Sequence, residues 1–128
     1  MGKYFNNFSN FGAVIGGGLA YLVGGFDSLV NALIILMCID YLTGIIKAVH
    51  TKKLSSKIGF QGILKKILIL SIVCVAVVCE RDLGIEAVRE IAIMFFCMNE
   101  GISILENASA LDIPIPEKLK DALLQIRK

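Results

Sequence analysis

The sequence predicts an all-α integral membrane protein, and three observations lead to this fold class. The 128 residues are 56% hydrophobic, with a mean hydropathy of +0.77, well above an ordinary soluble domain. The first 110 residues contain too few polar side chains to cover the surface of a soluble domain. Long apolar runs also recur between short segments whose charges are sorted by sign. A soluble helical bundle with an unusually apolar core is the alternative.

Four apolar segments are candidate membrane spans, because a helix needs about 20 mostly apolar residues to cross the hydrocarbon. They cover residues 8–26, 29–49, 63–79 and 88–111, within a transmembrane domain of residues 1–111. The third contains the uninterrupted run ILILSIVCVAVVC, whereas the fourth contains the polar stretch MNEGISILEN. We therefore expect four transmembrane helices, with three as the alternative.

The charges between these segments predict their orientation. Residues 47–66 contain six lysines and no acid, whereas residues 80–90 contain four acids and only two arginines. Because an excess of Lys and Arg marks cytoplasmic loops, we expect residues 47–66 inside the cell and residues 80–90 outside. Residues 24–28 then form an external hairpin, and both termini lie in the cytoplasm.

A separate tail, residues 112–128, follows the last span. Pro114 and Pro116 cannot continue a helix, because proline lacks an amide donor and favours extended geometry before it. The following residues predict a C-terminal amphipathic helix that lies on an anionic inner leaflet, packs on a neighbouring subunit or remains a solvated tail. Its apolar positions follow helical spacing at Leu119, Ala122, Leu123 and Ile126.

Small residues recur at four-residue intervals along the first span. Such a face allows the backbone of another helix to approach closely. The partner is either the second span of the same chain or another copy of the chain, so these are candidate helix-association residues. They are Gly12, Gly16, Ala20 and Gly24.

Asp40 lies inside the second span, where an ionised carboxylate costs about 3 kcal/mol on insertion scales. It must pair, lose its charge or face water. Thr43, Gly44 and Lys47 follow on or beside the same helical face, and Lys47 is near enough to the inner surface to extend into water. This face is a functional hypothesis, with a buried hydrogen bond between helices as the alternative.

The fourth span carries a second polar face. Its nine apolar side chains between residues 91 and 105 favour insertion by about 3–5 kcal/mol, which Glu100 and Asn99 nearly cancel. We therefore expect this helix to be stable across a membrane only when partners or water satisfy its polar side chains, and to adopt more than one arrangement. The polar residues are Asn99, Glu100, Ser103, Glu106 and Asn107.

No catalytic constellation, cofactor motif or metal-ligand pattern is evident, so we expect a protein that is not an enzyme. The acid pairs near residues 80–90 have no accompanying nucleophile or phosphate-binding glycine loop. Anionic lipid head groups suffice to explain the basic segment without nucleic acid. The four cysteines lie in apolar runs, and we interpret them as small buried hydrophobes rather than redox or zinc residues: Cys38, Cys74, Cys79 and Cys97.

Four motifs occur in a specific order between residues 30 and 124: DYLTG, LSSKIGFQGILKK, NEGISILEN and IPIP. This ordered set resembles the phage-lysis and toxin-secretion holin family, which includes holins of phages of Gram-positive bacteria and clostridial toxin-release holins. The resemblance implies a small protein that oligomerises in the bacterial cytoplasmic membrane and opens lesions at a set time. Through these lesions a phage endolysin or a large folded toxin would leave the cell.

The family supplies no catalytic residues and about three spans, whereas the charge pattern here gives four. A small ion channel or transporter subunit, with Asp40 and Glu100 as cation ligands or proton carriers, is one alternative. A non-conducting holin antagonist is the other. The candidate pore-lining or interhelical polar residues are Asp40, Thr43, Gly44, Lys47, Asn99, Glu100, Ser103, Glu106 and Asn107.

Overall fold

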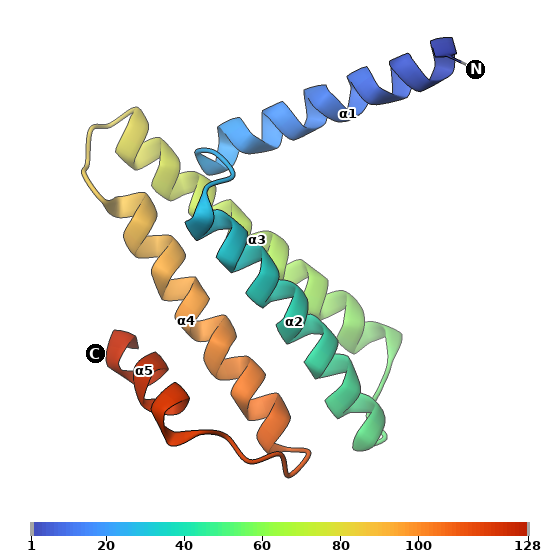
Figure 1. Ribbon diagram of the computed structural model, residues 1–128, viewed down its shortest axis with the longest axis vertical. Helices are drawn as coiled ribbons and strands as arrows, with labels where there is room; N and C mark the ends of the chain where they lie inside the picture. Colours follow the sequence, from blue (N-terminus) through green and yellow to red (C-terminus); the bar gives the residue numbers. More distant parts are fainter. Residues whose placement is uncertain (1, 128) are drawn as a thin grey trace.

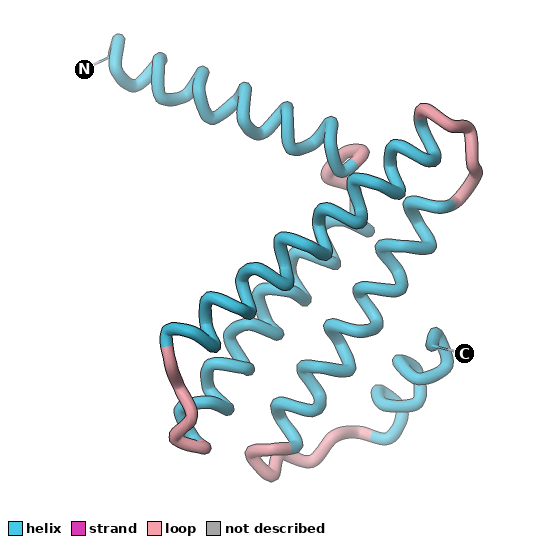
Figure 2. Tube along the Cα trace, turned by 180° about the vertical axis from the view of Figure 1, so that it is seen from behind, coloured by secondary structure: helices cyan, strands magenta, loops and turns pink. Residues whose placement is uncertain are grey.

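The structure, a computed structural model, describes the backbone of residues 2–127 and the side chains of residues 2–124. Within these residues it is entirely helical, which confirms the all-α class. Helices α2, α3 and α4 pack as a bundle in which α3 runs antiparallel to α2 and α4, α1 projects away from one end, and α5 folds back along α4 (Figures 1 and 2). The helices are α1 (Gly2–Val23), α2 (Ser28–His50), α3 (Ser56–Arg81), α4 (Val88–Ser109) and α5 (Glu117–Arg127).

Side chains and backbone geometry at the connections explain where the helices begin and end. Asp27 caps α2 by accepting a hydrogen bond from the Val30 amide at 3.0 Å, and Ser55 caps α3 through the Ile58 amide at 3.2 Å. The connection between α3 and α4 contains Gly84 in the left-handed region, with φ at +72°. Residues 110–116, with their two prolines, separate α4 from α5.

Two helices, α2 and α3, are long and apolar enough to cross a membrane. Only 17% of the apolar window in each is buried inside the chain, whereas the core helix of a soluble protein is mostly buried. Large apolar side chains are therefore exposed along both helices, which is favourable only in lipid. These helices indicate a membrane location. Helices α1 and α4, with 22 residues each, are long enough but too polar to be candidate spans by themselves, so the expected four spans are not confirmed.

An apolar core joins the three bundle helices at the end near residues 24–27. Leu33 of α2, Val73 of α3 and Ile93 of α4 have no exposed surface. The same core includes Val30, Met37, Val77 and, at the end of α1, Val23. Hydrophobic packing therefore holds one half of the bundle, and hydrogen bonds and ion pairs between the helices hold the other half.

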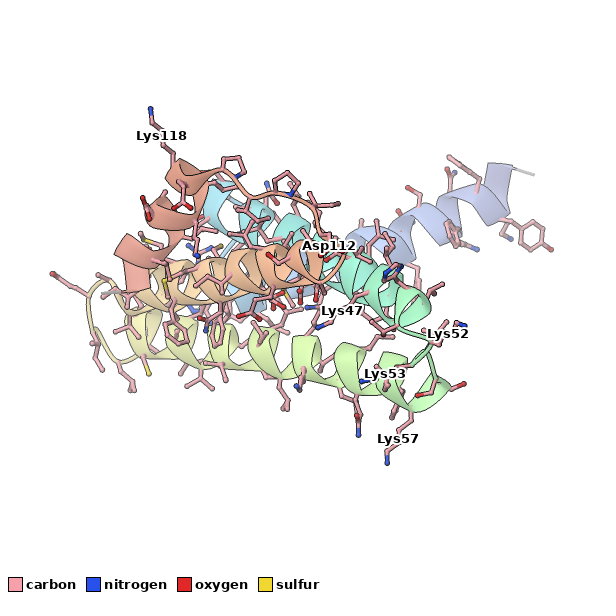
Figure 3. All side chains as sticks on the ribbon, turned by 90° about the horizontal axis from the view of Figure 1, so that it is seen from below. Lys47, Lys52, Lys53, Lys57, Asp112 and Lys118 are labelled. Atoms are coloured by element: carbon pink, nitrogen blue, oxygen red, sulfur yellow. The ribbon has the colours of Figure 1, made fainter. Side chains whose placement is uncertain are left out.

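The basic segment lies at the opposite end of the bundle. Lys52 and Lys53 of the α2–α3 connection and Lys57 of the first turn of α3 gather there (Figure 3). Most of the segment of residues 47–66 is helical, because α3 begins at Ser56 and a loop covers only residues 51–55. Lys65 and Lys66, at the start of the expected span of residues 63–79, are helical, and Lys65 is exposed whereas Lys66 is not.

Candidate functional site

A set of polar side chains lies inside the bundle, from about halfway along its length toward the end with the α2–α3 connection. At 1.5 Å per residue, three of its members lie about 14–15 Å from the helix ends that adjoin the α2–α3 and α4–α5 connections. In a hydrocarbon core about 30 Å thick, this position is close to the midplane. We call this set the polar layer: Asp40 and Thr43 of α2, Lys66 of α3, and Glu100 and Asn107 of α4.

Lys66 joins two carboxylates from different helices. Its Nζ lies 2.8 Å from Asp40 Oδ2 and 2.9 Å from Glu100 Oε2. The three side chains are only 17%, 16% and 6% exposed, in the order Lys66, Asp40, Glu100. Charge-assisted hydrogen bonds of this length offset part of the desolvation cost of each group. Formally, the three side chains carry one net negative charge when all are ionised.

Asn107 connects α4 to α2 beside this ionic contact. Its Nδ2 donates to Thr43 Oγ1 at 2.9 Å and to Asp40 Oδ1 at 3.2 Å, and the Thr43 hydroxyl donates to the Ile39 carbonyl at 2.9 Å. A Cβ at Gly44 would lie 3.8 Å from the same Asn107 nitrogen. The small residue at position 44 thus leaves room for the amide.

Two glycines allow α3 to approach α2 next to the polar layer. The Tyr41 hydroxyl donates to the Gly59 carbonyl at 3.3 Å, and a Cβ at Gly62 would lie 3.3 Å from Tyr41 Cε2. Gly59, Gly62, Lys66, Ile69 and Val73 recur every three or four residues on α3, so they share one helical face. This face turns Lys66 toward Asp40 and Glu100.

A cavity of about 350 Å³ adjoins the polar layer. It is large enough for several water molecules and has polar groups to bind them. Asn99 and Ser103 of α4 line it together with Asp40, Lys66 and Glu100. The polar side chains of the bundle interior therefore face a space between α2, α3 and α4, whereas many of the apolar side chains of α2 and α3 outside the core are exposed on the outer surface.

The structure brings most of the sequence-predicted polar residues into this region. Asp40, Thr43 and Gly44 meet Glu100 and Asn107 at the layer, and Asn99 and Ser103 line the cavity. Two candidates lie elsewhere. Lys47 is outside the cavity lining, and Glu106 is exposed beside the groove between α4 and α5.

Sequence reasoning missed Lys66, which was assigned to the basic loop. A signal was available, because two carboxylates at membrane depth on neighbouring helices require a compensating cation. The spacing of Lys66 from Ile69 and Val73 also places it on the face of α3 that packs into the bundle.

The small-residue face expected on α1 does not pack against α2. A Cβ at Gly12 or Gly16 would meet nothing within 4 Å, while Ala20 is half-buried near α3. Gly24 has a local function instead: its φ is +81°, and a Cβ there would lie 2.5 Å from Arg89 Nε. Gly12 and Gly16 thus lie on an open helix face, whereas Gly24 lies in a tight turn.

Arg89 holds that turn against the start of α4. Its guanidinium donates to the Val23 carbonyl at 2.8 Å, the Gly25 carbonyl at 3.2 Å and both Asp27 carboxylate oxygens at 2.8 and 3.1 Å. The hydrogen bonds from Arg89, together with the Val30 amide, lower the pKa of Asp27 from 3.8 to about 2. This arginine, 5% exposed, ties three chain segments together at one end of the bundle.

These features define a small all-helical membrane protein with apolar outer surfaces and a salt-bridged layer inside. Residues 17–128 match the family model of the bacteriophage holin family. The chain belongs to this family, as its ordered motifs predicted.

Relatives of similar length occur in several Gram-positive bacteria. The chain is 46% identical over 123 residues to an uncharacterized 14.9 kDa protein in the nagH 3′ region of Clostridium perfringens, covering 94% of this chain and 93% of the relative. It is 42% identical to the uncharacterized protein Lin0175 of Listeria innocua, covering 89% and 79%. The uncharacterized protein YqxH of Bacillus subtilis is 37% identical, covering 83% and 76%. No solved structure matches the chain.

Proposed function

We propose that the protein is a holin that oligomerises in the bacterial cytoplasmic membrane and opens lesions large enough for folded proteins. The observation that carries this proposal is the polar layer, in which two acids and an amide are held at membrane depth by contacts between helices. A structure that only had to persist in lipid would be as well served by apolar side chains there.

In the closed state, each chain shelters its own polar groups. The single positive charge of Lys66 is shared between the Asp40 and Glu100 carboxylates, and the Asn107 amide donates to Thr43 of α2. Helix α4 is not apolar enough to meet the criterion for a span by itself, so α2 and α3 support it in the bilayer. The bundle is therefore stable while α4 remains docked.

In the open state, α4 separates from α2 and α3, and several copies turn their polar layers toward shared water. Water removes the desolvation cost of the carboxylates, so each subunit that joins the assembly favours the separation of α4 in its neighbours. The cavity between the helices is the site at which water enters first. A rising density of the protein in the membrane drives this association by mass action.

The cargo of such a lesion is an endolysin or a large toxin. In the proposed orientation, the end with Lys52, Lys53 and Lys57 faces the cytoplasm, and the C-terminal helix lies on the same side. Helices α2, α3 and α4 then cross the membrane three times.

The test is induced expression in a bacterial host, with release of a folded cytoplasmic enzyme as the readout. Asp40→Leu and Glu100→Leu each remove one carboxylate and leave a neutral pair with Lys66, so we expect normal insertion with release reduced at least tenfold. Glu106→Leu, on the exposed side of α4, is the matched control and should release enzyme as the wild type does. Unchanged release in both layer variants would disprove the role of the polar layer.

A small cation channel is the second candidate, favoured by the net negative charge beside the cavity. Potassium efflux without enzyme release would identify a channel, and release of both would identify a holin. A chain that inserts, causes neither and delays lysis by another holin would be an antagonist.

A further inference from the structure

Helix α1 stands apart from the bundle. It crosses the bundle direction at a wide angle and projects from the end that is opposite to the basic connection (Figures 1 and 2). It contacts α3 near its C-terminal end, where Arg81 donates to the Tyr21 carbonyl at 2.8 Å and its guanidinium lies 3.9 Å from the centre of the Tyr21 ring. Most of α1 therefore has no partner within the described chain.

Six of the large side chains of α1 lie on one side of the helix, where at 100° per residue they fall within an arc of roughly 80°. Phe5, Val14 and Tyr21 lie outside this arc. Asn6, Asn10, Ala13 and Gly17 occupy the opposite side. We call the six residues the bulky stripe: Tyr4, Phe8, Phe11, Ile15, Leu19 and Leu22, which are between 46% and 81% exposed.

The composition of α1 differs from that of the two apolar helices. Lys3, three asparagines and five glycines interrupt its 22 residues, and it does not meet the length and hydropathy criterion that α2 and α3 meet. If α1 crossed the bilayer, its asparagine face would need a partner in the hydrocarbon. If it lay along the bilayer surface, the bulky stripe would enter lipid while the asparagines remained in water.

The position of α1 selects the second arrangement. Its C-terminal end is joined to the start of α2 by residues 24–27 and to the end of α3 by Arg81, and both helices are long and apolar enough to span, so a bilayer must surround the bundle beside it. A helix that crosses the direction of the spans lies along the membrane plane. The apolar surface nearest to it is then the acyl-chain boundary of one leaflet.

We propose that α1 is an interfacial helix that binds the outer leaflet of the membrane through the bulky stripe, with its N-terminus outside the cell. This proposal rests on the proposed orientation, in which the basic end faces the cytoplasm. It replaces the expected cytoplasmic N-terminus and leaves three spans. Through the Val23–Asp27 turn, lipid contacts of α1 act directly on the start of α4, which Arg89 joins to that turn.

The first test measures depth in the bilayer. The full-length protein, with its four native cysteines changed to alanine, carries a spin label at one position at a time between residues 4 and 22. It is reconstituted in phosphatidylethanolamine–phosphatidylglycerol vesicles. Accessibility to oxygen, which concentrates in lipid, is compared with accessibility to a water-soluble nickel complex. We expect a period of about 3.6 residues, with Phe8→Cys, Phe11→Cys and Ile15→Cys deep, and Asn6→Cys, Asn10→Cys and Ala13→Cys in water.

Three results would overturn the proposal. A depth that changes steadily from residue 4 to residue 22 would show that α1 is a span. Protection from both reagents along the stripe would show that a second copy covers it. Access of the nickel complex to every position would show a solvated helix.

The second test determines the side of the membrane. Lys3→Cys in the same background should react with a membrane-impermeant maleimide in intact cells that do not yet release enzyme, and Lys53→Cys only after lysis. Reaction of both residues only after lysis would place the N-terminus inside and contradict the proposal. Reaction of Lys53→Cys in intact cells would instead contradict the orientation on which the proposed function depends.

Discussion

Lys66 bonds to two carboxylates that come from two other helices, and none of the three groups is more than 17% exposed. Removing one partner of a buried ion pair is more damaging than replacing the whole set, because the remaining charges keep their desolvation cost and lose their attraction. We infer that loss of this lysine weakens the packing of α4 on α2 and α3 at the polar layer.

We therefore predict that Lys66→Gln lowers the free energy of unfolding in detergent by about 3 kcal/mol, the lower end of the range for a broken buried pair. Lys65→Gln is the control, since this neighbour is exposed and should change stability by less than about 0.5 kcal/mol. Adding Asp40→Asn and Glu100→Gln to Lys66→Gln should recover most of the loss, because no unpaired charge remains. Equal melting temperatures for the two lysine variants would contradict the assignment.

Asp27 gives the structure a pH dependence outside the membrane-spanning segments. Because the folded-state pKa, about 2, lies below the ordinary value of 3.8, this group stabilises the fold above about pH 4. The contribution is lost as the pH falls from 4 to 2. The Asp27 side chain is 46% exposed, so solvent screening limits its effect to about 1 kcal/mol.

The variant Asp27→Asn can still cap α2 but cannot bind Arg89 as an anion. We expect a lower melting temperature than the wild type at pH 7 and a smaller difference between the two at pH 2. Thermal unfolding in detergent at several pH values measures both. Asp82→Asn, at an aspartate that is 53% exposed, is the control. A constant difference between Asp27→Asn and the wild type across this range would show that the Asp27 charge is not responsible.

At the scale of elements, the positions of the helices could be predicted but the start of α3 could not. Long apolar runs separated by glycine or proline segments indicate where helices form, and each expected span overlaps one helix, although residues 24–26 of the first lie in the α1–α2 connection. A lysine count does not distinguish the first turns of a helix from a loop, so the expected span begins at residue 63 and leaves residues 56–62 of α3 in the connection. The face of each lysine, not its presence, distinguishes Lys65 from Lys66.

Helix α5 is the element whose position depends on its surroundings. Leu123 packs on α4 at Gly101, where an added Cβ would lie 3.1 Å from Leu123 Cδ2. Gly101 is adjacent to Glu100 of the polar layer, so a docked α5 lies at the depth of that layer. Lys118, Lys120 and Asp121 are exposed there and would face hydrocarbon if α4 spanned a bilayer (Figure 3 shows Lys118 projecting from α5).

We therefore predict that α5 leaves α4 when the chain enters a bilayer. In inside-out vesicles, trypsin should cut the wild type at Lys118 and Lys120 as fast as it cuts Gly101→Leu, in which the larger side chain displaces Leu123. Cleavage at exposed Lys53 in the α2–α3 connection reports the sidedness of the vesicles. Slower cleavage of the wild-type tail, restored by Leu123→Ala, would show that α5 stays docked.

At the scale of the whole molecule, the sequence predicts a membrane protein with acids and amides inside its helices, because such residues are rare in lipid and stand out. It does not predict how the helices are arranged. Helical periodicity reports which residues share a face but not which neighbour that face meets. The partner of Asp40 and Glu100 and the crosswise direction of α1 are properties of the assembled bundle.

The central claim is that lesions open when α4 separates from α2 at the polar layer. Thr43 and Asn107 join these helices through side-chain atoms 2.9 Å apart. Thr43→Cys with Asn107→Cys, in a background without native cysteines, allows a short reducible crosslinker to hold the helices together. Each single-cysteine variant, treated in the same way, is the control.

The most direct measurement is release of a folded cytoplasmic enzyme from cells that contain the crosslinked protein, before and after a reducing agent is added. We predict no release while the crosslink is intact, prompt release after reduction, and unhindered release from both single-cysteine controls. Release from the crosslinked protein at the rate of the controls would contradict the claim, because α4 would then not need to leave α2 for the membrane to open.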